Sequence, residues 1–160
     1  MSLKEQCLDQ KISTKHGQHY SAISPGSFSK LVQYKLKHPL IPDRLVPGKL
    51  FLKDHINLTG MQISLGTVPP GKGTPFTHAH KLNEEVYIFV RGKGQMLVDD
   101  EIIEVEEGSA VRVAPAGVRA FRNTSEEELH YVVIQAKENS LSQDTFDDGI
   151  PGANPPSWPD

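Results

Sequence analysis

The sequence predicts an all-β fold, a barrel or sandwich of short strands, on three observations. The chain has 160 residues, 37% of them hydrophobic, which is enough for one globular core. From about residue 50, short segments rich in β-branched and aromatic residues follow one another closely. Turn-forming pairs of Gly, Pro, Asp and Thr separate these segments, as is typical of all-β domains. The predicted strands are 50–52, 61–68, 85–90, 95–98, 102–105, 110–113 and 130–136.

Charge and composition exclude several classes of protein. The formal net charge is −3 and no dense Lys/Arg cluster occurs, so no nucleic-acid partner is expected. No apolar run approaches the length of about 18 residues that a membrane helix needs, so no membrane partner is expected. Cys7 is the sole cysteine, which excludes an internal disulfide and a cysteine-based zinc site. The first residues are charged, unlike a secretory signal, so we expect a cytoplasmic location.

Residues 1–49 are predicted to form an N-terminal extension that packs on the barrel. Ser24-Pro25 is typical of a helix start, and apolar residues follow at near-helical spacing over 28–36. An extended conformation explains the same stretch nearly as well. Three prolines and a glycine then interrupt the chain, so 37–49 is predicted to be a loop.

The barrel is predicted to span residues 50–137, followed by a tail rich in Pro, Asp and Ser over 138–160. The predicted strand 85–90 is apolar on both faces, because Tyr87 and Phe89 alternate with aliphatic residues. Its inner face would line the barrel. Its outer face needs a cover, which either the N-terminal extension or a second subunit would provide, so a homodimer is expected.

A cluster of ionisable residues precedes this strand. Residues two apart on a strand point to the same side, so Phe76, His78 and His80 would share a face, with the histidine Cα atoms roughly 7 Å apart. The two imidazoles can converge on one ion, and Glu84 or Glu85 could add a carboxylate. Such a set leaves coordination positions open for water, substrate or dioxygen. It suits iron, manganese, nickel or zinc.

The spacing of these residues resembles the first motif of the cupin superfamily. That motif reads Gly, five residues, His-X-His, three or four residues, Glu, six residues, Gly. Here His78 and His80 are followed by Glu85 after four residues and by Gly92 after six more. This second spacing selects Glu85 over Glu84, whereas the leading glycine is displaced by one residue.

A second stretch resembles the second cupin motif, which reads Gly, five residues, Pro-X-Gly, two residues, His, three residues, Asn. The chain offers Gly108, Pro115, Gly117 and Asn123 in this order, with gaps that differ by one residue. The histidine is missing, and Arg119 stands near its place.

The resemblance covers about residues 60–136 and implies a double-stranded β-helix, also called a jelly-roll barrel. It implies that His78, His80 and Glu85 bind a divalent metal ion as cofactor. Cupins of this kind include dioxygenases, isomerases, decarboxylases and sugar-modifying enzymes. Others only bind or sense a small-molecule ligand, or serve mainly in assembly, and the fold does not choose among these functions.

Arg119 leaves two interpretations open. A guanidinium stays protonated and is a poor metal ligand, but inside the barrel it would favour a carboxylate or phosphate. In the first interpretation, three protein ligands hold a metal and Arg119 steers an anionic substrate towards it. In the second, the metal site has been lost and the cavity binds a small molecule. An exposed loop arginine is a further alternative.

Other residues are assigned by the alternation of faces. His130 lies between Leu129 and Tyr131, so we expect it on the opposite, exposed face. The loop 81–83 is expected at the barrel mouth, within reach of a ligand. Large apolar residues of the barrel are expected in the core and can also line a ligand cavity. The predicted substrate-binding residues are Arg119, Phe76, Tyr87, Phe89, Met96 and Phe121.

Overall fold

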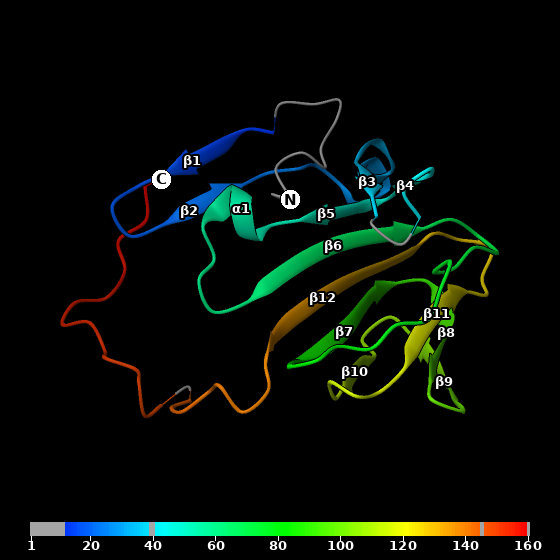
Figure 1. The fold of residues 1–160 in the computed structure, drawn as a ribbon. Coiled ribbons are helices and arrows are strands. Elements are labelled where there is room, and N and C mark those ends of the chain that lie inside the picture. The colour runs from blue at the N-terminus through cyan, green and yellow to red at the C-terminus, as the bar shows by residue number, and fades with distance from the viewer. Residues whose placement is uncertain (1–11, 39–40, 145, 160) are drawn as a thin grey trace.

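The barrel consists of two β-sheets. A computed structural model describes residues 12–38, 41–144 and 146–159. The larger sheet contains β5 (Lys49–Phe51), β6 (Gln62–Val68), β7 (Asn83–Arg91), β10 (Ala110–Val113) and β12 (Leu129–Lys137), and the smaller sheet contains β8 (Lys93–Val98), β9 (Glu101–Glu106) and β11 (Arg119–Asn123). The strand orders are β10-β7-β12-β6-β5 and β11-β8-β9, with all neighbours antiparallel (Figure 1). The prediction of an all-β jelly-roll barrel is confirmed.

A hydrophobic core fills the space between the two sheets. Every second residue is buried from Glu85 to Phe89 on β7 and from Leu129 to Val133 on β12, as the alternation of faces requires. From the smaller sheet, β8, β9 and β11 each add one large side chain to the same cluster. The buried members of the core are Tyr87, Phe89, Met96, Val105, Val113, Phe121, Leu129, Tyr131 and Val133.

The register of the larger sheet determines which side chains share its inner face. Directly paired residues on neighbouring strands point to the same side. Phe89 on β7 is opposite Tyr131 on β12, which is opposite Gly66 on β6, which is opposite Lys49 on β5. Lys49 therefore lies on the inner face, although it begins an edge strand. One end of the barrel has a second such row, in which Gln135 stands between Glu85 and Gln62.

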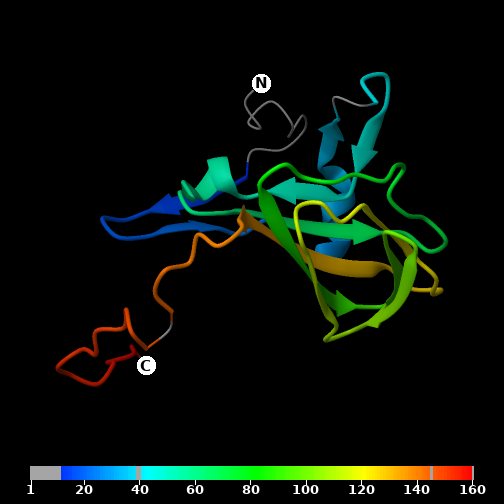
Figure 2. The ribbon, with the colours of Figure 1, turned by 60° about the horizontal axis from the view of Figure 1, so that its bottom comes forward.

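The N-terminal residues form short elements on the outside of the larger sheet (Figures 1 and 2). The predicted helix start at Ser24 is wrong, because the helix begins only at Phe28 and has 3-10 geometry. Gly26 has a φ of +94°, which is incompatible with a helix running through it. The predicted loop 37–49 is also wrong in part, because β4 pairs with β3. The elements are β1 (Thr14–His16), β2 (Ser21–Ile23), the 3-10 helix η2 (Phe28–Gln33), β3 (Lys35–Lys37), β4 (Leu45–Pro47) and α1 (Lys53–Ile56).

A second hydrophobic cluster joins β2, η2 and α1 to the outer face of β5 and β6. Leu31 of η2 and Leu50 of β5 are almost wholly buried in it, and Ile63 and Leu65 of β6 pack against them. The same layer covers His130. This residue lies on the outer face as predicted, but the predicted exposure is wrong, since η2 lies over it and leaves 6% of the residue exposed.

The residues after β12 run outside the barrel as an extended tail (Figure 1). Phe146, Ile150 and Trp158 are exposed along it. Cys7 and the start of the predicted N-terminal extension lie outside the described residues. In the ranges that the structure describes, no helix has the length and apolarity needed to cross a membrane.

Candidate metal and ligand site

The histidine segment before β7 is positioned by the loop that leads into β11. The prediction that His78 and His80 lie on a regular strand is wrong, because the segment is irregular and forms one isolated bridge. In that bridge His78 exchanges two backbone hydrogen bonds with Arg119, of 3.1 and 2.9 Å. The backbone N–H of His80 donates to the carbonyl of Pro115 at 2.9 Å. These bonds keep the alternation of a strand, so the two imidazoles still lie on one side.

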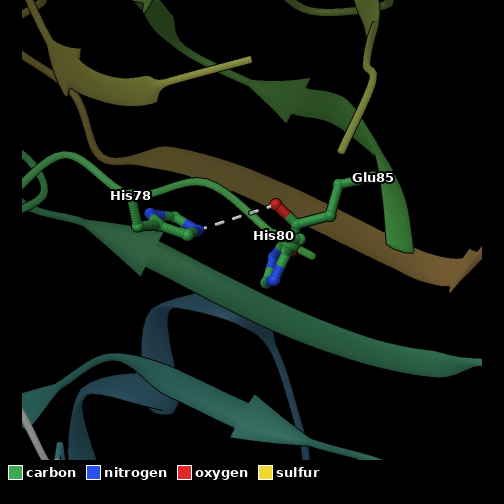
Figure 3. Close-up of side chains that lie close together, drawn as sticks. All are labelled: His78, His80 and Glu85. Atoms are coloured by element: carbon green, nitrogen blue, oxygen red, sulfur yellow. Dashed lines mark ion pairs between the residues drawn. The ribbon is translucent and has the colours of Figure 1, made fainter. Parts of the chain in front are cut away.

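The structure brings both imidazoles together with the carboxylate of Glu85 (Figure 3). One ligand atom from each of the three residues lies within 4.8 Å of the others. His80 Nε2 is 3.2 Å from Glu85 Oε1, and His78 Nε2 is 3.7 Å from Glu85 Oε2. The imidazoles are about one quarter to one third exposed, at 26% and 32%, whereas the Glu85 side chain is 7% exposed. The group therefore opens to solvent on the histidine side.

The two oxygens of Glu85 have different surroundings. Oε2 accepts hydrogen bonds from the Tyr87 hydroxyl at 2.5 Å and from Arg119 Nη2 and Nε at 2.8 and 3.1 Å. Oε1 faces His80 and Gln135. Burial would raise the pKa of Glu85, but the contacts with His78, Tyr87 and Arg119 outweigh it and hold the pKa far below its usual range. The carboxyl is therefore ionised at neutral pH, with Oε1 directed at the imidazoles.

Arg119 is fully buried, so the alternative of an exposed loop arginine is wrong. Its side chain points into the barrel and forms an ion pair with Glu85 at 2.8 Å. Nη1 donates to the backbone carbonyl of Gly117 at 2.8 Å. The guanidinium is therefore already paired with a carboxylate and has no exposed surface.

Gln135 is a site residue that the sequence reasoning missed. Its amide nitrogen is 2.8 Å from His80 Nε2 and 3.3 Å from Glu85 Oε1. Burial lowers the pKa of His80, and the Glu85 carboxylate only partly offsets this, so the imidazole is neutral at neutral pH and accepts from the amide. The alternation of β12 could have placed Gln135 on the inner face, because Tyr131 and Val133 precede it at intervals of two.

The donor set fits a divalent cation. Neutral imidazole nitrogen and ionised carboxylate oxygen are ligands of iron, manganese, nickel and zinc. Ligand atoms about 2.1 Å from an ion lie roughly 3 Å apart when they are neighbours around it. The distance of 3.2 Å between His80 Nε2 and Glu85 Oε1 is close to this separation. His78, His80 and Glu85 could therefore hold a metal, with open positions on the solvent side.

Lys49 adds a cation to the same inner wall, and the sequence reasoning missed it too. Its ammonium lies over the ring of Phe51, 5.0 Å from the centroid. Burial lowers the pKa of Lys49, and the Glu85 carboxylate raises it in part. No ion pair between Lys49 and a carboxylate occurs in the described ranges. Lys49 was predicted only as the end of a loop, and its inward direction follows from pairing with β6.

The other predicted ligand contacts divide into two groups. Phe89, Met96 and Phe121 are core residues, with 0%, 0% and 6% of their surface exposed. Tyr87 is also in the core, but its hydroxyl reaches Glu85. Phe76 alone lies at the mouth, with its ring 4.6 Å from that of His38 and 6.2 Å from that of His78.

The loop that follows His80 borders a surface hollow of about 340 Å³. Pro115, whose carbonyl accepts from the His80 backbone, also lines it. The hollow therefore lies beside the histidine segment, and Lys81 and Leu82 of the predicted loop 81–83 line it, whereas Asn83 already belongs to β7. Its lining residues are Lys81, Leu82, Ala114, Pro115, Ala116, Lys137 and Glu138.

Comparison with known proteins agrees with this architecture. The family described as "Cupin domain" matches residues 64–135. A solved cupin protein from Bacteroides fragilis is 38% identical, with 65% of this chain and 88% of that chain covered and a TM-score of 0.63. A putative sugar phosphate isomerase from Acidithiobacillus ferrooxidans is 26% identical, with 64% and 66% covered and a TM-score of 0.54. No protein of curated function matches.

The chain belongs to the cupin superfamily. The matched residues include the histidine segment and most of the barrel. A Cupin 2 conserved barrel domain protein from Salinispora arenicola, 16% identical with a TM-score of 0.51 over 56% of this chain and 75% of that chain, shares the fold alone.

Proposed function

We propose that this cupin binds a divalent metal ion through His78, His80 and Glu85 and takes a small-molecule ligand at the open side of that ion. The observation that carries the proposal is the convergence of the three ligand atoms within 4.8 Å at a solvent-exposed mouth. When bound, the metal would supply Lewis-acid or oxygen-activating chemistry. That chemistry is common to the reaction types that the cupin resemblance implies, namely dioxygenase, isomerase and decarboxylase.

The ligand is an anion in this proposal, and charge supports it. On the inner face of the barrel one carboxylate, Glu85, is accompanied by two basic residues, Arg119 and Lys49. Arg119 is already paired with Glu85, so Lys49 is the cation left for a ligand. A divalent metal would add further positive charge. An excess of positive charge in a partly buried site favours carboxylate or phosphate groups.

Metal binding is tested on protein purified without chelator and then titrated with Mn²⁺, Fe²⁺, Ni²⁺ and Zn²⁺. We expect the wild type to bind about one ion and His78→Ala/His80→Ala to bind far more weakly, because two of three ligands are removed. His16→Ala/His19→Ala is a matched control with two exposed histidines. Equal, negligible uptake by wild type and the site variant would contradict the proposal.

The anionic ligand is tested by calorimetry with succinate and glucose 6-phosphate on metal-loaded protein. We expect Lys49→Met to weaken binding of the preferred anion about tenfold, because a partly buried charged hydrogen bond contributes roughly 1.5–3 kcal/mol. Lys93→Met, which changes an exposed lysine at the start of β8, is the control. Unchanged affinity in Lys49→Met would show that the ammonium does not contact the ligand.

A non-catalytic binding protein with little metal is the second candidate. The observation in its favour is the Arg119–Glu85 ion pair, because the guanidinium already neutralises the carboxylate and repels a second cation. A ligand that raises the melting temperature equally with and without EDTA would favour this candidate.

A further inference from the structure

The second cupin motif lacks its histidine here, and Arg119 stands near that position. Arg119 supplies no metal ligand, because its guanidinium is paired with Glu85. A different residue reaches the same group of atoms from β12, the strand next to β7 in the larger sheet. Gln135 lies on the inner face of β12, directly opposite Glu85 on β7. We propose that Gln135 is the fourth metal ligand of this site, through its amide oxygen.

The distances support this assignment. The Gln135 amide nitrogen, His80 Nε2 and Glu85 Oε1 form a triangle with edges of 2.8, 3.3 and 3.2 Å. Three ligand atoms on one face of an octahedron around an ion at about 2.1 Å have edges of roughly 3 Å. One end of the amide therefore lies at the separation from His80 and Glu85 that a further ligand atom would have.

The amide can change roles because its two ends are almost alike in size. Without a metal, the NH₂ group donates to the His80 lone pair and to Glu85, which satisfies lone pairs that a metal ion would otherwise accept. Half a turn of the amide exchanges nitrogen for oxygen at the same place. The oxygen then faces the ion, and an amide carbonyl is an established ligand type for manganese and other hard cations.

The assignment of Gln135 rests on the proposed metal site, and it predicts whether metal affinity falls or rises when Gln135 is removed. If Gln135 only competed with the metal as a hydrogen-bond donor, its removal would free His80 and tighten metal binding. If it is a ligand, its removal weakens binding, and the loss of one ligand from four is expected to be tenfold or more, since even indirect partners contribute about 10–100-fold.

The experiment titrates Gln135→Leu and Gln135→Asn with Mn²⁺ and Co²⁺, by calorimetry and by the visible absorption of the Co²⁺ complex. The shorter amide of Asn keeps the polarity and cannot reach the ion, which provides a second variant if Leu disturbs folding. Gln62→Leu is the matched control. It changes the neighbouring residue of the same row, whose amide accepts from the Lys53 backbone at 3.0 Å instead.

We expect both Gln135 variants to lose affinity at least tenfold and to show an altered Co²⁺ spectrum, with Gln62→Leu like wild type. Equal or tighter binding in the Gln135 variants, while wild type binds metal, overturns the assignment of Gln135 alone. A wild-type protein that binds no metal overturns the assignment together with the proposed function.

Discussion

Arg119 and Glu85 form the most consequential residue pair of the barrel. Both are buried, and the guanidinium donates twice to one carboxylate oxygen. Removing one partner of such a pair leaves an uncompensated buried charge. The pair therefore gives the site a structural role that does not depend on a metal.

We predict that Arg119→Met lowers the free energy of unfolding by about 3–5 kcal/mol, as for other buried pairs that lose one partner. Urea denaturation of metal-free protein at pH 7 measures it. The double variant Arg119→Met/Glu85→Gln should be less destabilised than Arg119→Met, because no unpaired carboxylate remains. A single variant as stable as wild type would show that water solvates Glu85 in the barrel.

The sequence predicted the residues of this site unevenly, for physical reasons. Motif spacing was enough to choose Glu85 over Glu84, because the glycine after the strand occupies a turn that needs a positive φ. Gly92 has a φ of +84°, and a Cβ there would lie 2.7 Å from the Glu128 carbonyl oxygen. Gln135 and Lys49 belong to no motif, and only the register of β12 and β5 with their neighbours brings them to the inner face.

At the scale of elements, the barrel strands could be predicted except β11, and the N-terminal strands could not. Strand 110–113 agrees with β10, and the others differ from the structure by one or two residues at their ends. The barrel strands are predictable because they are long enough for buried and exposed residues to alternate visibly in the sequence. β1 to β4 have three residues each, which is too few to show an alternating pattern. The exposure of His130 was mispredicted because η2 covers it.

The contact between η2 and β12 depends on a carboxylate. Glu128 Oε2 accepts from the Ser29 hydroxyl at 2.5 Å and lies 3.1 Å from His130 Nε2, while Phe28 stacks on that imidazole. The hydrogen bond from Ser29, and then that from His130, lower the pKa of Glu128 below its usual 4.5. The ionised carboxylate is thus stabilised in the folded protein, which ties the N-terminal layer to the barrel.

This pKa shift gives a pH-dependent prediction. A carboxyl with a lowered pKa in the folded state stabilises the fold above its usual pKa and ceases to do so as the pH falls through the lowered value. We therefore expect Glu128→Gln to destabilise the protein by about 1 kcal/mol at pH 7 and by less at pH 3. Urea denaturation at both pH values measures the difference. An equal loss at both would mean that the charge of Glu128 contributes nothing.

At the scale of the whole molecule, the outer face of the larger sheet is covered only in part. The N-terminal layer packs on β5 and β6, and its cluster contains no residue of β7. On that strand Val86, Ile88 and Val90 point outward, and Val90 is 37% exposed. By register Val132 and Ile134 of β12 adjoin them. The apolar strip continues past the edge of the layer, which is the arrangement that the predicted homodimer requires.

We predict that the protein is a dimer in solution and that Ile88→Lys shifts it to the monomer, because a buried lysine in this strip would lose its hydration. Size exclusion with light scattering measures the mass. Ile102→Lys is the matched control, because Ile102 is 62% exposed on β9 of the smaller sheet and should leave the dimer intact. A wild-type monomer across the micromolar range would contradict the dimer. A dimer that survives Ile88→Lys and dissociates in Ile102→Lys would move the interface to the smaller sheet.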